Sequence, residues 1–310
     1  YQVRFKKTSL RTGLRAEQTI VDGEFTSSKT TVHQQYLNLV PNFLLSRKFS
    51  SAYTFSVAYN LRLHRPSISN LNPFVNNNDS LNISFGNPAL EPQTLHTVSL
   101  QNRIAVGGFF LSLSFNGSYS DNLIVQFADF NNVTGVTRIT NANVGKENQA
   151  SVGLTVNAPI SEKFNFNLNT QLRYNKIENT SNLLQRREGF SGSAAGNFHY
   201  KLVGKFTISG SGGVSKSPYA FVNSPSLQGF YQVNFGQKLF AEKLALTVNV
   251  NNFHQAFLQF RTVTENSNFR ATTINSNPYR VIYFGATYNF GKLKEEVSKK
   301  KGVSNDDTIQ

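Results

Sequence analysis

Histidine offers the widest range of possible chemistry in this chain, because its ring can bind a metal ion, transfer a proton or contact a substrate. The five histidines are His33, His64, His96, His199 and His254. No two of them stand at a metal-ligand spacing such as H-E-x-x-H, and the chain contains no cysteine. The sequence therefore predicts neither a metal site nor a bound cofactor.

Signatures of nucleophilic catalysis and of phosphate binding are also missing. The chain has no G-x-S-x-G motif and no P-loop. The glycine-rich run at 210–213 lies within an alternating apolar–polar segment, whereas a phosphate loop leads into a helix. A hydrolase carrying Ser and His on a barrel wall is an alternative, but no particular pair is indicated. We predict that the chain is not an enzyme.

The net charge of +14 suggests an anionic partner. Basic residues are scattered, with clusters only at 4–15 and in the C-terminal tail, and no nucleic-acid-binding motif is present, so nucleic acid is not predicted as a partner. Lysine and arginine on a barrel wall attract anionic solutes or lipopolysaccharide. His64 and Arg62, at the end of one alternating segment, are the candidates for substrate binding. The alternative for each is a solvated wall residue.

Strict alternation of apolar and polar residues is the clearest pattern in the chain. Between 164 and 174 the even positions are Phe164, Phe166, Leu168, Thr170, Leu172 and Tyr174, and the odd positions are Asn165, Asn167, Asn169, Gln171 and Arg173. The same alternation occurs in 53–64, 111–120, 151–157, 244–251 and 282–290. A period of two predicts strands with one apolar and one polar face.

About twelve strands are predicted in this way. Their ranges are 3–21, 33–46, 51–64, 94–105, 109–126, 138–159, 163–178, 186–202, 205–215, 228–239, 243–262 and 277–290. Each reaches the roughly 9–11 residues that a tilted membrane strand needs, whereas no apolar run approaches the roughly 18 residues of a membrane helix. Charged residues make up only 15% of the chain, but its 27 phenylalanines and 12 tyrosines argue against disorder, because disordered chains contain few aromatic residues.

The predicted connections alternate between short and long. The short ones lie near 47–50, 106–108, 160–162, 203–204 and 240–242, and the long ones near 22–31, 65–93, 127–137, 179–185, 216–227 and 263–276. Outer-membrane barrels have short periplasmic turns and long extracellular loops. This alternation predicts an all-β, antiparallel transmembrane β-barrel and not a soluble sandwich.

Three stretches resemble a known family. The run Gly86-Asn87-Pro88-Ala89-Leu90-Glu91-Pro92, which follows Asn72-Pro73-Phe74, resembles the G-N-P-x-L-x-P-E segment of TonB-dependent receptor barrels, with Gln93 in place of the usual Glu. The run Val248-Asn249-Val250-Asn251-Asn252-Phe253 resembles the N-[LI]-F segment of their penultimate strand, although His254 departs from the usual Asn or Asp. Tyr288-Asn289-Phe290 and the basic tail resemble the end of Bacteroidetes-type outer-membrane barrels.

The resemblance implies a 22-stranded barrel with an N-terminal plug. Residues 1–290 would then be the C-terminal portion of the barrel without the plug, and 291–310 a disordered basic tail in the periplasm. The absence of methionine and of a signal peptide agrees with a trimmed or internal start. A self-contained barrel of about twelve strands is the alternative.

By the same resemblance, the protein is a receptor or transporter in the outer membrane of a Gram-negative bacterium. It would take up a scarce solute such as a metal chelate, driven by a TonB-type protein acting through the missing N-terminal part. Its other partners would be lipid, lipopolysaccharide and the barrel assembly machinery, which would read Tyr288 and Phe290 unless these only form an aromatic girdle. A passive pore or an adhesive barrel is the alternative function. The Gly86–Pro92 run is interpreted as a rigid turn, with a ligand contact as the alternative.

Overall fold

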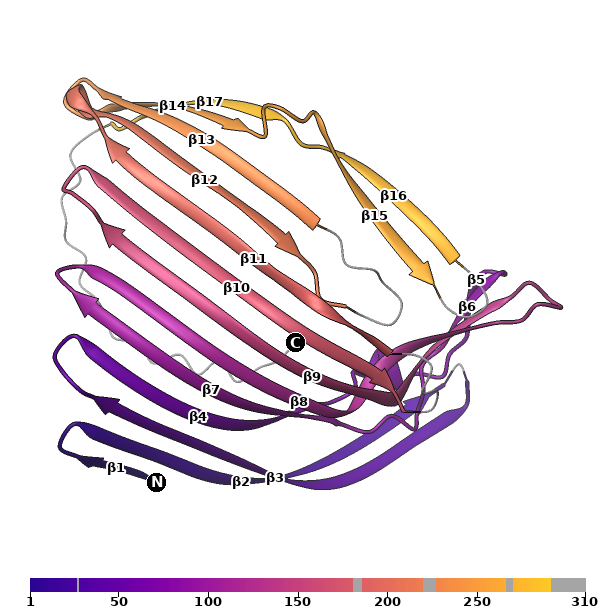
Figure 1. Cartoon of the computed structure of the whole chain (residues 1–310). Coiled ribbons are helices and arrows are strands. Elements are labelled where there is room, and N and C mark those ends of the chain that lie inside the picture. The colour runs from indigo at the N-terminus through magenta and orange to yellow at the C-terminus, as the bar shows by residue number, and fades with distance from the viewer. Residues whose placement is uncertain (27, 181–185, 220–226, 266–269, 291–310) are drawn as a thin grey trace.

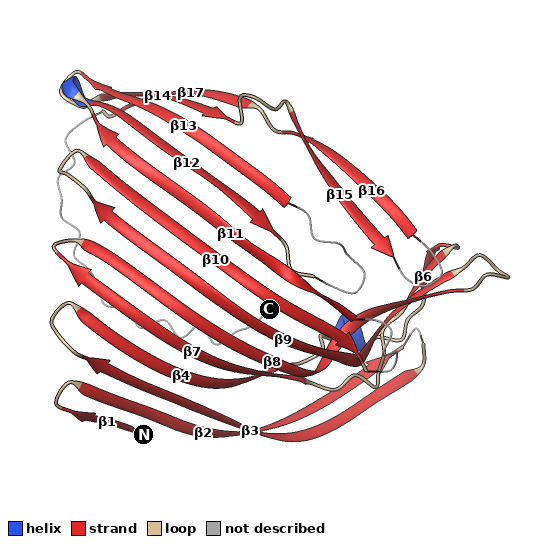
Figure 2. Cartoon of the chain, in the orientation of Figure 1, coloured by secondary structure: helices blue, strands red, loops and turns tan. Residues whose placement is uncertain are grey.

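The computed structural model describes residues 1–26, 28–180, 186–219, 227–265 and 270–290, and these residues are almost entirely β-structure (Figure 2). The strands are β1 (Gln2–Phe5), β2 (Thr8–Phe25), β3 (Thr30–Lys48), β4 (Tyr53–His64), β5 (Asn76–Asp79), β6 (Asn82–Ser84), β7 (Gln93–Val106), β8 (Phe109–Phe130), β9 (Thr137–Pro159), β10 (Phe164–Asn179), β11 (Arg186–Lys201), β12 (Phe206–Lys216), β13 (Leu227–Leu239), β14 (Leu244–Asn251), β15 (Phe257–Glu265), β16 (Arg270–Pro278) and β17 (Val281–Tyr288). The helical elements are α1 (Ile68–Leu71) and the 3-10 turn η1 (Val203–Lys205). Neither is long or apolar enough to span a membrane.

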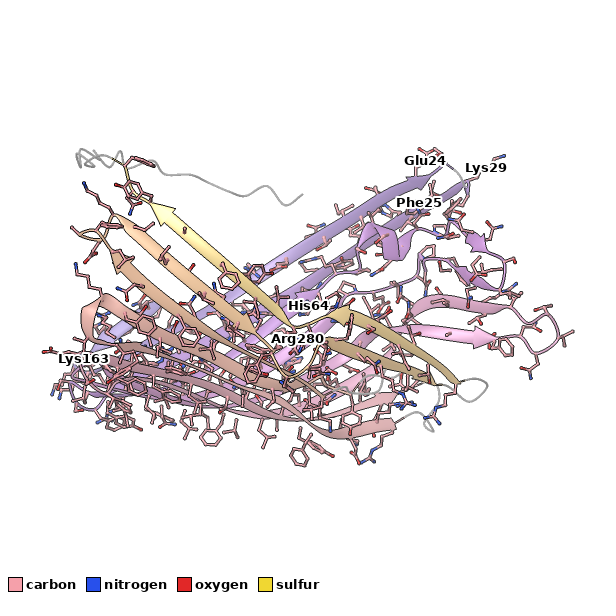
Figure 3. The ribbon with its side chains drawn as sticks, turned by 90° about the horizontal axis from the view of Figure 1, so that it is seen from above. Glu24, Phe25, Lys29, His64, Lys163 and Arg280 are labelled. Carbon is pink, nitrogen blue, oxygen red and sulfur yellow. The ribbon has the colours of Figure 1, made fainter. Side chains whose placement is uncertain are left out.

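One antiparallel sheet dominates the structure. Its path runs β1-β2-β3-β4-β7-β8-β9-β10-β11-β12-β13-β14-β17, so almost every strand pairs with the next one along the chain. Figures 1 and 3 show this sheet curved into a trough, with β1 and β17 at opposite edges. The prediction of an all-β antiparallel architecture is confirmed. Two small hairpins add to it: β5–β6, which joins β9 through β6, and β15–β16, which pair only with each other.

The strand register keeps the two faces of the sheet chemically distinct. Leu168 pairs with Val156 on one side and Gly196 on the other, whereas Asn169 pairs with Thr155 and Ala195. Because neighbouring strands place paired residues on the same face, the even positions of β10 and their partners form a continuous apolar face. The odd positions and their partners form a polar face.

Very little of the chain is buried in a protein core. Among the described residues the buried apolar side chains are Val32, Val40, Leu71, Leu90 and Ile177. By contrast, Leu172 is 57% exposed and Phe190 58%, and both lie on the apolar face. Exposed apolar area on this scale marks a surface that meets another apolar phase.

Aromatic rings gather where the apolar face reaches the short turns. Phe164 lies 6.0 Å from Tyr200 and 6.4 Å from Phe198, measured between ring centroids, and Phe206 stacks on Phe235 at 6.4 Å. Aromatic side chains of this kind form girdles at the two interfaces of membrane barrels.

Most connections lie as their lengths predict. The turns that join β3 to β4, β7 to β8, β9 to β10, β11 to β12 and β13 to β14 are all at one end of the sheet in Figure 1. The longer connections from β4 to β7 and from β8 to β9 are at the other end, together with the short connection from β2 to β3. We call these the short-turn end and the long-loop end. Gly107 and Gly108 form one short turn with φ of +54° and +86°, a conformation that glycine adopts without steric cost.

Four predicted ranges are wrong in detail. The segment 3–21 is two strands, because Lys6 takes a φ of +51° and turns the chain between β1 and β2. The segment 243–262 is also interrupted, because β14 ends at Asn251 and β15 begins at Phe257. The predicted loop 22–31 is largely strand, since β2 and β3 continue well past the length needed to cross a membrane. The predicted loop 263–276 includes the end of β15 and most of β16, which form a separate hairpin. The predicted tail 291–310 lies outside the described residues.

Candidate functional site

The longest connection, residues 65–92, folds back onto the polar face of β3; we call it the motif loop. The Gln34 side-chain amide donates to the carbonyl oxygens of Pro88 at 2.8 Å and Leu90 at 2.9 Å. Leu90 is fully buried and Leu71 is 1% exposed. These contacts fix the middle and the end of the loop against the wall of the sheet.

Two asparagines of the sheet hold the rest of the Gly86–Pro92 run. Asn143 exchanges a pair of hydrogen bonds with Glu91, from its amide to the Glu91 carbonyl at 2.9 Å and from the Glu91 N–H to its side-chain oxygen at 2.8 Å. Asn122 donates to the Pro92 carbonyl at 3.3 Å. Asn87 of the motif donates in turn to the Asn141 carbonyl at 3.0 Å. The motif is therefore held to the sheet mainly through its backbone N–H and carbonyl groups.

Gly86 sits where no side chain fits. A Cβ atom at this position would lie 2.4 Å from the Asn72 carbonyl oxygen and 2.6 Å from the Asn70 carbonyl oxygen. The Gly86 N–H donates to that Asn72 oxygen at 2.8 Å, which brings these two parts of the loop together. Asn72 also accepts from the Phe74 N–H at 3.0 Å, across Pro73.

A pocket of about 270 Å³ opens beside this junction. Its lining residues are Ser69, Asn72, Phe74, Asn76, Ser84, Phe85, Gly86, Gln126, Ile139, Thr140 and Asn141. The lining carries amides, hydroxyls and two phenyl rings and no charged side chain. Nearby, the Asn82 side-chain amide donates to Asp79 at 2.7 Å and, with the Leu81 N–H, lowers the pKa of that carboxyl.

Arg62 and His64, the predicted substrate-binding candidates, both lie on the polar face at the end of β4. His64 pairs in register with Gln93, the residue that ends the motif, and Arg62 pairs with Leu95. Figure 3 shows His64 in the middle part of the trough. The next residue, Arg65, makes an ion pair with Glu17 and donates to Thr19 at 3.1 Å. The structure thus places the two candidates beside the motif loop, and their role stays a prediction.

A second loop is fixed to the polar face by a buried asparagine. Asn175 is fully buried, and its side chain donates to the Tyr219 carbonyl at 3.0 Å and accepts from the Tyr219 N–H at 3.3 Å. It also donates to Glu147 at 3.2 Å. The start of the connection after β12 is therefore anchored to β10. Both anchored loops reach the same face of the sheet.

Asn252 and Phe253 mark the end of β14. Asn252 has a φ of +45°, and its side chain accepts from the Tyr231 N–H at 2.8 Å and donates to the Tyr279 carbonyl at 3.3 Å. Phe253 packs edge-on against Tyr231 with ring centroids 5.2 Å apart. The asparagine side chain thereby joins β13 to the segment that precedes β17.

Replacing Asn252 with alanine should destabilise this end of the sheet by about 2 kcal/mol, because the Tyr231 N–H loses its acceptor and the positive φ becomes strained. The measurement is the urea midpoint of the refolded barrel. Asn251→Ala is the matched control, since the buried Asn251 side-chain oxygen has no partner within the described part of the chain. Equal losses in both variants would contradict a specific role for Asn252.

Tyr288 and Phe290 close the last strand at the short-turn end. Their ring centroids are 4.6 Å apart, and Tyr288 pairs with Leu244 on the apolar face. This position agrees with an aromatic girdle. Recognition by the assembly machinery stays a prediction.

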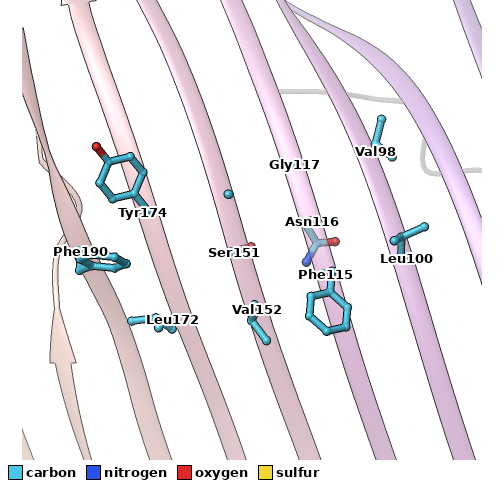
Figure 4. Close-up of a pocket in the computed structure, with 11 residues that line it drawn as sticks. Val98, Leu100, Phe115, Asn116, Gly117, Ser151, Val152, Leu172, Tyr174 and Phe190 are labelled. Carbon is cyan, nitrogen blue, oxygen red and sulfur yellow. The ribbon is translucent and has the colours of Figure 1, made fainter.

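The apolar face has its own shallow depression of about 440 Å³ over β7 to β11, shown in Figure 4. Gly117 and Ala150 form its floor, and the larger side chains around it include Val98, Phe115 and Tyr174. The depression is lined mainly by the same kind of apolar side chains that cover the rest of the apolar face. It therefore belongs to the surface that meets the apolar phase. The histidines are dispersed, and the described residues contain no group of three or more potential metal ligands.

Several residues of this site could not be predicted from the sequence. Gln34, Asn122, Asn143 and Gln126 each contribute an amide at the motif loop, yet they lie far from it in sequence. Each stands in or beside a strand where amides are abundant, so no local pattern distinguishes it. The buried asparagine Asn175 is hidden in the same way.

Comparison with known proteins gives one family and a consistent fold. The model of the outer membrane protein β-barrel family matches residues 1–288. No curated protein sequence matches the chain. Among solved structures, the FrpB iron transporter from Neisseria meningitidis is 14% identical with a TM-score of 0.65 and covers 93% of this chain and 44% of its own.

Two further solved structures show the same architecture. The siderophore receptor PirA from Pseudomonas aeruginosa is 14% identical with a TM-score of 0.55, over 89% of this chain and 48% of its own. The copper transporter OprC is 11% identical with a TM-score of 0.63, over 92% of this chain and 47% of its own. The chain therefore spans less than half the length of these proteins.

Proposed function

Because this chain belongs to the outer membrane protein β-barrel family, we propose that it forms part of the wall of a receptor that takes up a scarce solute, such as a metal chelate, with TonB-type coupling. It lies in the outer membrane of a Gram-negative bacterium. Residues 1–290 would be barrel, and 291–310 a periplasmic tail.

The observation that carries the proposal is a curved wall with two unlike faces. The apolar face would contact lipid, and the polar face would line the lumen. Arginines on the polar face include Arg62, Arg103, Arg173 and Arg187, according to the strand register. A wall with this charge favours anionic solutes, and many metal chelates are anionic.

The long-loop end would be extracellular and would capture the solute. The motif loop and the connection at Tyr219 both fold onto the polar face there, so they narrow the entrance to the lumen. The parts that gate the lumen and contact the energy-coupling protein would lie in the rest of the receptor. The solved structures that share this fold are named as an iron transporter, a siderophore receptor and a copper transporter. These names support a metal-containing solute for this chain.

Uptake by intact cells tests this proposal. Cells that make the full-length protein are expected to accumulate radiolabelled ferric chelates, and a protonophore should abolish the accumulation because TonB-type coupling needs the inner-membrane potential. Arg62→Glu should lower uptake about tenfold through charge repulsion. Asn60→Glu, two residues away on the same face of β4, is the matched control. Flux that persists with the protonophore would support the alternative of a passive pore.

A further inference from the structure

We propose that the pocket beside the motif loop binds a neutral, hydroxyl-rich ring, that is, a sugar residue. The pocket, of about 270 Å³, lies between the motif loop and the long-loop ends of β8 and β9. It is separate from Arg62 and His64, which do not line it. The proposal concerns binding alone and does not depend on whether the receptor transports a metal chelate.

The pocket is lined by side-chain amides without a hydrogen-bond partner in the described residues, and such amides can bind hydroxyl groups. Gln126 of β8 and Asn141 of β9 pair directly across the two strands, and both line the pocket. Within the described ranges neither side-chain amide has a hydrogen-bond partner, so both are available to a ligand. An amide offers donors and an acceptor side by side, which matches a hydroxyl group that both donates and accepts.

Two phenyl rings in the pocket also suit a sugar ring. Phe74 and Phe85 line the pocket, and Phe74 is 51% exposed. The face of an aromatic ring is electron-rich, so it attracts the slightly positive C–H groups on one face of a sugar ring. Because no charged side chain lines the pocket, an anion or a cation bound there would lose hydration without gaining a counter-charge.

The pocket is held open by backbone contacts. The Phe85 N–H donates to the Ile139 carbonyl at 3.0 Å, where β6 runs parallel to β9, and the Gly86 N–H donates to Asn72 at 2.8 Å. These bonds fix the side that carries Phe85 relative to the side that carries Thr140. A preformed site lowers the entropic cost of binding, and the volume is close to the lower end of the range for small-molecule sites.

Saturation-transfer NMR on the purified full-length protein in detergent tests the proposal. The probes are glucose, galactose, mannose and N-acetylglucosamine, and, in a second arm, the core oligosaccharide released from the lipopolysaccharide of the same cells. We expect one arm to show binding with a Kd of about 1 mM. The arm that binds identifies the source as a free solute or as the lipopolysaccharide sugar.

Variants make the assignment specific. Gln126→Ala and Phe74→Ala should each weaken binding about tenfold, the loss expected from one hydrogen bond or one stacking contact. Asn77→Ala removes an exposed amide of β5 that does not line the pocket, and it should bind as the parent does. Because the exposed Gln126 side chain has no hydrogen-bond partner in the described residues, Gln126→Ala should keep the fold. Its affinity for the sugar is therefore the decisive measurement. Absence of binding in both arms, or undiminished binding by Gln126→Ala, would overturn the proposal.

Discussion

Leu168→Arg should destabilise the folded barrel by about 2–4 kcal/mol, the cost of placing a cation on the lipid-facing side near the middle of a membrane barrel. Leu168 lies on the apolar face of β10, between Val156 and Gly196. The neighbouring change Asn169→Arg should cost far less, because Asn169 is exposed on the polar face, where a guanidinium stays hydrated.

Urea titration of the two variants, folded into lipid vesicles, measures this difference. The same residue type is introduced at adjacent positions of one strand, so strand propensity and overall charge are matched. Equal destabilisation by the two arginines would contradict the assignment of faces. A larger loss at Asn169 would reverse it.

Gly86→Ala should release the motif loop and cost about 3 kcal/mol. The added Cβ would lie 2.4 Å from the Asn72 carbonyl oxygen and 2.8 Å from its nitrogen. Both are backbone atoms, so the clash is relieved only if the segments that carry Asn72 and Gly86 move apart. Limited proteolysis should then cut within 65–92, and the urea midpoint should fall.

Gly117→Ala is the control for this change. Nothing lies within 4 Å of a Cβ at Gly117, which is on the apolar face, so alanine fits there. A motif loop that stays resistant to protease in Gly86→Ala would contradict the role of Gly86 as a close backbone contact. It would also weaken the interpretation of the motif as a rigid turn.

The sheet could be predicted from the sequence because its signal is local. In β10 every second residue from Phe164 to Tyr174 shares a face, and such a strand needs only neighbours of the same pattern to extend the sheet. The resemblance of the motifs to TonB-dependent receptor barrels, and the outer-membrane location, are confirmed by the family match over residues 1–288 and by the solved structures.

Departures from alternation were harder to predict. The turn at Lys6 and Lys7 interrupts a polar stretch in which two lysines could equally lie on a strand. In the structure it is identified by the positive φ of Lys6 and the pairing of Phe5 with Thr8. The break after Asn251 depends on Asn252, whose side chain bonds to Tyr231, 21 residues away. Non-local contacts of this kind leave no periodic pattern.

The candidate site was predictable in part. The sequence identified the Gly86–Pro92 run and placed His64 at the end of its strand, and the structure brings these together through the pairing of His64 with Gln93. The pocket was not predictable, because it combines Phe74 and Gly86 of the loop with Gln126 and Thr140 of two other strands. Its formation depends on how the loop folds back.

Site-directed spin labelling along β10 tests whether the sheet is a wall with one lipid-facing and one lumen-facing side. Because this sequence contains no cysteine, each cysteine introduced from 164 to 174 gives one labelled site within it. In lipid vesicles we predict that oxygen, which partitions into lipid, reaches labels at the even positions. A water-soluble nickel complex should reach labels at the odd positions, with a period of two residues. Equal access of the nickel complex at even and odd positions would contradict a wall with one lipid-facing and one lumen-facing side.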